Sequence, residues 1–161
     1  SADGATLSRW LNSNLVDAAL HFGPIPGSGF ESDPLFEERL VLVSSEDRPL
    51  QRWDSNYIYV DWGERFRRDH ALAYPVTETA AVTFGEGTLA LSYLLQQGGS
   101  GYFPFRMVQN HLDKQTLFLV PKAPEFTRQV MLSRSPLFPP YDWYEAFRNH
   151  FMERGQGTID P

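Results

Sequence analysis

Four histidines are the side chains of this sequence best suited to acid–base or metal chemistry. They stand far apart in the chain, and none lies in the H-E-x-x-H spacing or in another spacing typical of metal ligands. We therefore predict no metal site and expect ordinary, partly exposed histidines, with the first one, at the end of a predicted strand, as the exception. The histidines are His21, His70, His111 and His150.

Motifs that support covalent catalysis or nucleotide binding do not occur either. The chain has no G-x-S-x-G elbow and no cysteine, which removes thiolate nucleophiles, disulfides and thiolate metal sites. Gly85-Glu86-Gly87 precedes a predicted helix, but it lacks the third glycine of a dinucleotide-binding loop and carries an acidic residue where a phosphate would bind. Glu37 and Glu38 are adjacent on a predicted strand and so point to opposite faces. We predict no enzymatic activity and no cofactor.

The composition indicates a globular chain with a substantial core. Of 161 residues, 42% are hydrophobic and 14% aromatic, which suits one ordinary domain or two small lobes. With 14 Lys and Arg against 20 Asp and Glu, the net charge is −6, and a negative domain repels nucleic-acid phosphates. The only basic cluster, residues 65–68 (RFRR), is interpreted as a solvated helix face. Apolar runs are too short for a helix that spans a bilayer.

Strands and helices are predicted to alternate along the chain. Thr88 is the predicted N-cap of one helix and Gly98 its stop, while Asp142 and Glu145 form a capping pattern before the last helix. Such alternation favours an α/β fold with largely parallel sheets. The predicted helices are 6–14, 64–72, 88–97 and 143–153, and the predicted strands are 16–22, 35–44, 57–61, 77–84, 101–105, 116–120 and 128–134, before a polar tail at 155–161.

Several segments together carry a family resemblance. Residues 14–22 (NLVDAALHF) are similar to a "G-x-L-D-x-A-L" strand, and residues 33–43 (DPLFEERLVLV) to "x-P-L-x-x-E-x-L-V-L-V". Residues 46–50 (EDRPL) stand in the place of "x-x-H-P-L", with arginine for the usual histidine, and residues 94–104 (LLQQGGSGYFP) are similar to a glycine-rich turn. The final Trp143 and Phe147 fit the last helix. In this order they resemble the effector-binding domain of LysR-type transcriptional regulators.

The resemblance implies a two-lobed fold like that of type 2 periplasmic binding proteins, with three-layer α/β/α lobes joined by crossover strands. Lobe I would comprise residues 1–45 and 134–161, and lobe II residues 46–133. A small effector would bind in the inter-lobe cleft. The family's opening strand, helix and strand and its winged helix-turn-helix domain have no counterpart here, so we expect lobe I to be incomplete.

Ligand-binding residues are nominated by the resemblance, together with the rule that ligands bind outside the carboxyl ends of strands. Each has a structural alternative. His21 would pair with an anionic effector or would be a packed histidine with one partner, Trp62 would only cover a lobe edge, and Tyr102 would satisfy a buried backbone group. The phenylalanines would equally be core residues. The nominated residues are His21, Phe22, Gly23, Asp61, Trp62, Phe84, Gly85, Thr88, Tyr102, Phe103 and Pro104.

Partners are also implied by the resemblance. The chain would form a homodimer or homotetramer, with Trp10, Leu11, Leu91 and Leu95 at the interface, or with the first two in the core instead. It would act in the cytoplasm, without a membrane partner, and would reach DNA only through the missing N-terminal domain. The alternatives are an exported solute-binding protein of the same fold and an enzyme on a similar fold, such as a dehydratase or deaminase.

Overall fold

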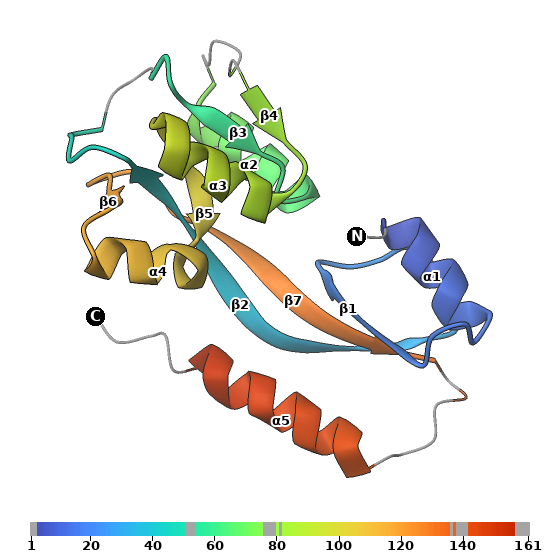
Figure 1. Cartoon of the computed structure of the whole chain (residues 1–161). Helices are drawn as coiled ribbons and strands as arrows, with labels where there is room; N and C mark the ends of the chain where they lie inside the picture. Colours follow the sequence, from blue (N-terminus) through green and yellow to red (C-terminus); the bar gives the residue numbers. More distant parts are fainter. Residues whose placement is uncertain are drawn as a thin grey trace. The chain divides into compact units, whose positions relative to one another are not determined.

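The computed structural model describes residues 3–50, 54–75, 80, 82–135, 137 and 142–156. The chain divides into two compact units, residues 1–38 with 129–161 and residues 39–128. These limits fall inside the two longest strands, β2 (Glu31–Ser44) and β7 (Phe126–Arg134), each of which contributes to both units (Figure 1). The lobe limits predicted from the sequence, after residues 45 and 133, lie further along the chain because they were placed at the ends of the strands.

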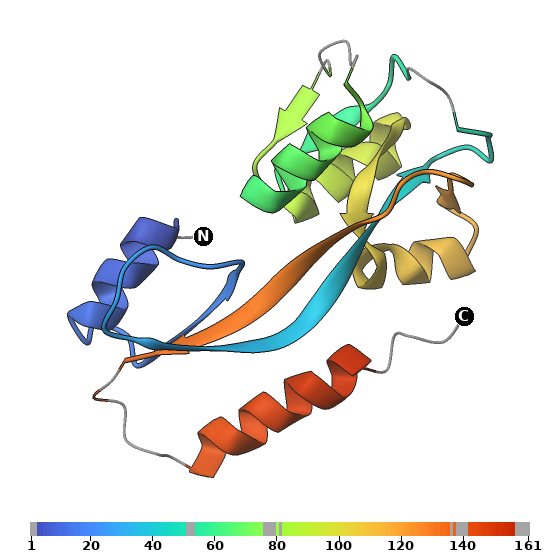
Figure 2. The same cartoon turned by 180° about the vertical axis from the view of Figure 1, so that it is seen from behind.

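The first unit is a small sheet with a helix on each face. Strand β1 (Ala18–Phe22) pairs antiparallel with β7, from Ala18 opposite Arg134 to Phe22 opposite Val130. Helix α1 (Gly4–Asn12) and helix α5 (Asp142–Gln156) lie on opposite sides of this sheet (Figures 1 and 2). The core beneath α5 consists of Leu35, Val130, Leu132 and Tyr144, with Phe147, Phe151 and Met152 packed against it.

The second unit contains parallel strands β3 (Ile58–Val60) and β4 (Val82–Phe84), followed along the chain by strand β5 (Ser100–Pro104) and strand β6 (Phe118–Leu119). Helices α2 (Glu64–Ala73) and α3 (Gly87–Gln97) cover opposite faces of the β3–β4 pair (Figures 1 and 2). Helix α4 (Phe105–Asp113) follows β5 directly. Alternate residues of β3 therefore enter two cores, because strand side chains alternate between faces. Ile58 and Val60 pack with α3, and Tyr59 packs with Phe66 of α2.

The prediction of largely parallel sheets is wrong. Strands β1–β7, β2–β5 and β2–β6 pair antiparallel, whereas β3 and β4 form a short parallel ladder and Tyr57 forms a single parallel bridge with Ser100. Alternation along the chain does not fix strand direction. Strands β5 and β6 pair with β2 although several elements separate them from it in the chain, and a connection of that length is compatible with either direction.

Element limits mostly agree with the sequence, with two corrections. Helix α4 was not predicted, although Phe105, Val108 and Leu112 recur at helical spacing and Val108 is fully buried. Helix α3 begins at Gly87 and is capped by Glu86 rather than by Thr88. The stop at Gly98 is confirmed, since its φ of +74° suits glycine. Residues 77–79 and 81 of the predicted strand 77–84, and most of the polar tail, lie outside the described residues.

Candidate functional site

Trp62, which follows strand β3, is held in one orientation by groups from two other elements. Its Nε1–H donates a hydrogen bond to the carbonyl oxygen of Tyr102 on β5 at 2.7 Å. Its ring meets the ring of Phe103 edge to face, with centroids 6.1 Å apart. At the start of α3, a Cβ at Gly87 would overlap the indole, so glycine is required for this approach. These contacts make Trp62 a rigid aromatic platform.

A guanidinium group lies on this platform. The Cζ atom of Arg128, on β7, lies 4.5 Å from the centre of the Trp62 ring, and the residue is only 8% exposed. Guanidinium groups are attracted to the faces of aromatic rings. Their fixed planar donors match the geometry of carboxylates. The platform therefore orients the strongest anion-binding type of side chain at a defined place in the second unit.

The sequence analysis did not nominate Arg128, although a signal for it exists. Strand β7 alternates in burial, and Phe126, Arg128 and Val130 are successive buried positions on one face. A charged residue in the inward series of a strand is uncommon and points to a partner or a ligand. The predicted strand over 128–134 is confirmed as part of β7, and its alternating burial is the signal that singles out Arg128.

Asp61 directly precedes Trp62 in the chain, and its carboxylate accepts hydrogen bonds from neighbouring residues. One carboxylate oxygen accepts from the Gly63 amide at 3.0 Å and the other from the Arg67 guanidinium at 2.7 Å. Its amide donates to the Phe84 carbonyl oxygen at 2.9 Å. The carboxyl ends of β3 and β4 thus meet at one edge, as expected for parallel neighbours. Ligand contact by Asp61 and Phe84 stays a prediction, and the Phe84 ring packs on Tyr93 with centroids 5.3 Å apart.

The start of helix α3 is occupied by its own capping carboxylate. Glu86 accepts hydrogen bonds from the amides of Thr88 at 3.1 Å and Leu89 at 2.7 Å. These amides hold the pKa of Glu86 below its usual value, because they stabilise the charged carboxylate. The backbone amide of Thr88 is therefore already engaged within the protein. Gly85 and Thr88 are exposed, and a ligand role for either stays a prediction.

The three nominated residues of strand β5 lie inside the second unit. Tyr102 is 1% exposed, and its hydroxyl donates to the Pro124 carbonyl oxygen at 2.8 Å while lying 2.8 Å from the Tyr74 hydroxyl. It thus satisfies a buried backbone group, the structural role considered for it. Burial raises the pKa of its phenol well above the usual value. Phe103 and Pro104 are also buried, and ligand contact by all three remains untested.

The nominated residues of the first unit are consecutive, and the first of them, His21, carries a buried imidazole. His21 is 6% exposed, with Nδ1 2.8 Å from the carbonyl oxygen of Gly23 and Nε2 2.7 Å from the hydroxyl of Ser133. Burial lowers the pKa of His21, and the Gly23 carbonyl opposes that shift in part. Gly23 has φ +65°, a conformation that favours glycine. Phe22 is 54% exposed. His21 has two protein partners rather than one.

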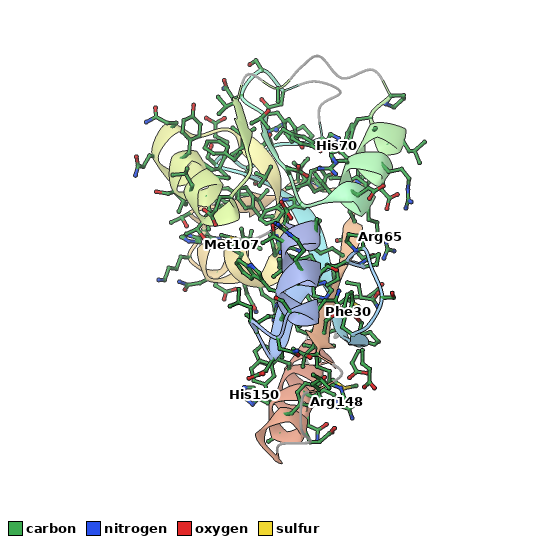
Figure 3. All side chains as sticks on the ribbon, turned by 90° about the vertical axis from the view of Figure 1, so that its right-hand side faces the viewer. Phe30, Arg65, His70, Met107, Arg148 and His150 are labelled. Atoms are coloured by element: carbon green, nitrogen blue, oxygen red, sulfur yellow. The ribbon has the colours of Figure 1, made fainter. Side chains whose placement is uncertain are left out.

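His70 on helix α2 is not the partly exposed histidine that was expected. It is 7% exposed and lies among aromatic rings (Figure 3), because α2 places it against the β3 and β5 face. Its Nε2 lies 2.9 Å from the Tyr57 hydroxyl, and burial lowers its pKa to about 4. Rings within 6.0 Å of its centroid belong to Tyr57, Tyr59, Phe66, Tyr74, Tyr102 and Phe126.

The four nominated interface residues differ in exposure. Trp10 on α1 is 37% exposed and Leu95 on α3 is 41% exposed, whereas Leu11 is fully buried and Leu91 is 8% exposed. Trp10 and Leu95 are therefore available to a partner. Leu11 and Leu91 belong to the cores of the first and the second unit.

No group of three His, Asp or Glu side chains in the described part of the chain could hold a metal ion. No helix among the same residues is long and apolar enough to cross a bilayer.

The family model and the solved structures that match this chain agree with one another. The family model described as the LysR substrate binding domain matches residues 1–156. The bromide-bound regulatory domain of HypT from Salmonella typhimurium superposes with a TM-score of 0.75 at 13% identity, covering 97% of this chain and 80% of that one. A comparison with curated protein sequences finds no match.

Two Pseudomonas aeruginosa structures are similar in the same way. The reduced OxyR regulatory domain has a TM-score of 0.70 at 19% identity, and the AmpR effector domain has one of 0.69 at 17% identity. Each comparison covers 92% of this chain and 78% of the other. At such identities the likeness shows the fold, which is the α/β fold of LysR regulatory domains.

Proposed function

We propose, from the premise that this chain belongs to the family of LysR substrate-binding domains, that it senses a small anionic effector for a bacterial LysR-type transcriptional regulator. The observation that carries the proposal is the family match over residues 1–156. The neighbouring structures are regulatory domains as well, and one of them was solved with a bromide ion bound.

The anionic character of the effector is supported by Arg128. Its guanidinium is held on the Trp62 ring, so its direction is fixed before a ligand arrives. A prearranged planar cation loses little side-chain entropy when a carboxylate binds, which favours affinity. The nearby carboxylates of Asp61 and Glu86 already accept hydrogen bonds from protein donors, which reduces their repulsion of an anion.

Signalling would follow from a shift in population. An effector that binds one arrangement of the domain better than another increases the population of that arrangement. In the full regulator this change would reach the winged helix-turn-helix domain that binds DNA. The domain itself would carry no enzymatic activity and would act in the cytoplasm as part of a homodimer or homotetramer, with Trp10 and Leu95 as the exposed interface candidates.

A ligand screen tests the function. The chain would be melted in the presence of small carboxylates, aromatic acids and amino acids, and every compound that raises the melting temperature would be measured by calorimetry. We expect at least one anionic compound to bind. Failure of all three classes with both this chain and the full regulator would contradict the sensor proposal, and turnover of any compound would contradict the absence of catalysis.

Matched arginine variants then test the site. We expect Arg128→Lys to weaken effector binding by roughly tenfold, because lysine keeps the charge but loses the planar paired donors. Arg65→Ala on α2, at an exposed arginine, should leave the affinity within about twofold. Equal affinity of Arg128→Lys and the unmodified chain, with unchanged melting temperature, would remove Arg128 from the site.

A further inference from the structure

The chain that leaves strand β2 and the glycine turn that leads into strand β5 lie side by side in the second unit. Ser45 donates its backbone amide to the Gly99 carbonyl oxygen at 2.9 Å. In return, the Gly99 amide donates to the Ser45 hydroxyl at 2.9 Å. These two hydrogen bonds join the end of β2 to the start of β5, and the proposed function gives this junction no role.

A third segment, the turn before strand β3, joins the other two through the carboxylate of Asp54. Its Oδ2 atom lies 2.5 Å from a terminal guanidinium nitrogen of Arg48 and also accepts a hydrogen bond from the Ser100 hydroxyl. Its Oδ1 atom accepts from the Asn56 amide at 3.0 Å. The Nε atom of Arg48 donates to the Ser44 hydroxyl at 3.1 Å. We call Ser44, Arg48, Asp54 and Ser100 the Arg48 clasp.

The Arg48 clasp is largely shielded from water. The side chains of Arg48 and Asp54 are 14% and 18% exposed, and Ser44 and Ser100 are 2% and 0% exposed. Exposed ion pairs contribute little to stability, because water and salt screen them. In a shielded pair, removal of one partner leaves the other charge poorly solvated, which is costly. The burial of this pair therefore favours a strong hold on all three segments.

The backbone of the glycine turn is shaped for the same contact. Gly99 has φ +116°, and a Cβ there would overlap the Asn56 carbonyl oxygen. That oxygen accepts from the Ser100 amide at 3.2 Å. Only glycine permits such an approach. The turn before β3 thus reaches the start of β5 through its backbone as well as through the Asp54 carboxylate.

We propose that Arg48 supplies the permanent charge of a conformational clasp, which holds the chain after β2, the turn before β3 and the start of β5 together at every pH at which Asp54 is ionised. A guanidinium stays charged throughout the pH range in which proteins fold. An imidazole at the same position would carry the charge only in acid. The inference goes beyond the proposed function and does not depend on an effector.

Few other ionisable groups surround the clasp. Glu46 and Asp47, beside Arg48 in the chain, are exposed. Helix α3 and strand β5 carry no acidic or basic residue. On the side of β3, His70 of helix α2 lies 2.9 Å from the Tyr57 hydroxyl. Because these groups are the same in every variant of Arg48, a difference between two such variants reports on position 48.

The variants Arg48→His and Arg48→Lys form a matched pair that tests the permanent charge. Urea titrations of both variants and of the unmodified chain would be made at about pH 5.5 and about pH 8, on either side of the ordinary imidazole pKa. In acid, the imidazolium of Arg48→His pairs with Asp54, so its pKa in the folded state lies above the unfolded value. This stabilisation is present below the unfolded pKa and is lost as the pH rises through the folded pKa.

The readout is the unfolding equilibrium constant of each variant divided by that of the unmodified chain. We expect this ratio to rise about tenfold from acid to base in Arg48→His, because a charged partner of Asp54 is lost. Lysine keeps its charge, so the ratio for Arg48→Lys should stay within about twofold. An Arg48→His ratio that is the same at both pH values, or an equal rise in Arg48→Lys, would overturn the proposal.

A double-mutant cycle tests the pairing without histidine chemistry. We expect Arg48→Gln and Asp54→Asn each to raise the unfolding equilibrium constant by about tenfold, and the double variant to raise it no more than about as much as either one, because it leaves no unpaired charge. Single effects that simply multiply in the double variant would overturn the pairing. The control is the more exposed pair of Arg65 and Asp69, 3.8 Å apart, whose cycle should show coupling of less than about twofold.

Hydrogen exchange at two backbone amides tests where Arg48 acts. The Asn56 amide is bonded to Asp54 and the Gly99 amide to Ser45. In Arg48→Lys, which keeps the charge but loses the fixed planar donors, we expect both amides to exchange about tenfold faster through local opening, with the amides of strand β1 unchanged. Unchanged exchange at both amides, or an equal rise in β1, would overturn the clasp.

Discussion

His21 in the first unit and His70 in the second are nearly equally buried, at 6% and 7% exposed, yet their surroundings differ in kind. His21 has hydrogen-bonding partners on both ring nitrogens and connects through Ser133 to the surface. His70 has a tyrosine hydroxyl at Nε2 and aromatic rings around it. In both, desolvation lowers the pKa. Burial alone therefore does not assign a role to a histidine.

The difference lies in what each histidine can transmit. A change of proton at His21 alters the direction of hydrogen bonds that end at an exposed hydroxyl. A change at His70 is confined to an aromatic core, where it alters only the stability of the unit. The comparison predicts that substitutions around His70 act mainly on the stability of the second unit.

The largest effect is expected in the aromatic core of the second unit. Phe66 is fully buried, with its ring 5.2 Å from His70 and 5.3 Å from Phe126. We expect Phe66→Ala to lower the free energy of unfolding by about 3–5 kcal/mol in urea titrations, because it leaves a cavity. Leu72→Ala on the same helix, at a 74% exposed residue, should change it by less than about 0.5 kcal/mol. Equal losses of unfolding free energy in the two variants would mean that Phe66 contributes no more to the core than an exposed residue of α2.

A smaller loss of unfolding free energy is expected when the pH is lowered. The folded-state pKa of His70, about 4, lies below the unfolded value of 6.5, so the unfolded chain binds the proton first. Stability is full above pH 6.5 and falls between pH 6.5 and pH 4, by roughly 2 kcal/mol when partial hydration of the imidazolium is allowed for. Urea titrations across this range measure the fall.

The variant His70→Phe isolates the contribution of this histidine. It should remove most of the decline between pH 6.5 and pH 4 and leave a smaller one in the same direction, because the pKa of His21 is also lowered. A decline of unchanged size in His70→Phe would assign the pH dependence to other groups.

The smallest effect concerns Gly23, whose carbonyl oxygen lies 2.8 Å from Nδ1 of His21. Gly23 has φ +65° and room for a Cβ, so Gly23→Ala should cost only backbone strain, about 1 kcal/mol. Gly85→Ala is the matched control, since Gly85 is exposed, has no strained φ and also has room for a Cβ. We expect the control to change thermal stability negligibly. Equal melting temperatures of the two variants would show that the turn after β1 tolerates a side chain.

Much of the fold could be predicted from the sequence. Helix α2 and strands β1 and β3 were placed within about two residues, because their apolar periodicity and the flanking turn residues are local signals. The family assignment followed from segment order. Strand direction could not be predicted, since nothing in the alternation of elements says whether β5 returns to β2 directly or through a crossover.

The candidate site was predicted less completely. The rule that ligands bind outside strand ends nominated Asp61, Trp62 and Phe84. The structure places Asp61 and Phe84 at one edge, where the Asp61 amide donates to the Phe84 carbonyl oxygen. Arg128 was missed because its importance depends on the Trp62 ring, which lies far from it in the chain. The hydrogen bonds that link His21, Ser133 and Ser32 could not be predicted either, since isolated serines on strands have no pattern until the strands pair.

The sequence by itself determined the family, the alternation of strands and helices, and the residues that follow each strand, since these depend on composition, spacing and order. Only the tertiary structure decided that two of the four histidines are buried, that an arginine lies on Trp62, and that hydrogen bonds join His21 to Ser133 and Ser133 to Ser32. Solvent exposure, ring contacts and hydrogen-bond direction arise between residues far apart in the chain. They exist only once the strands have paired and the helices have packed.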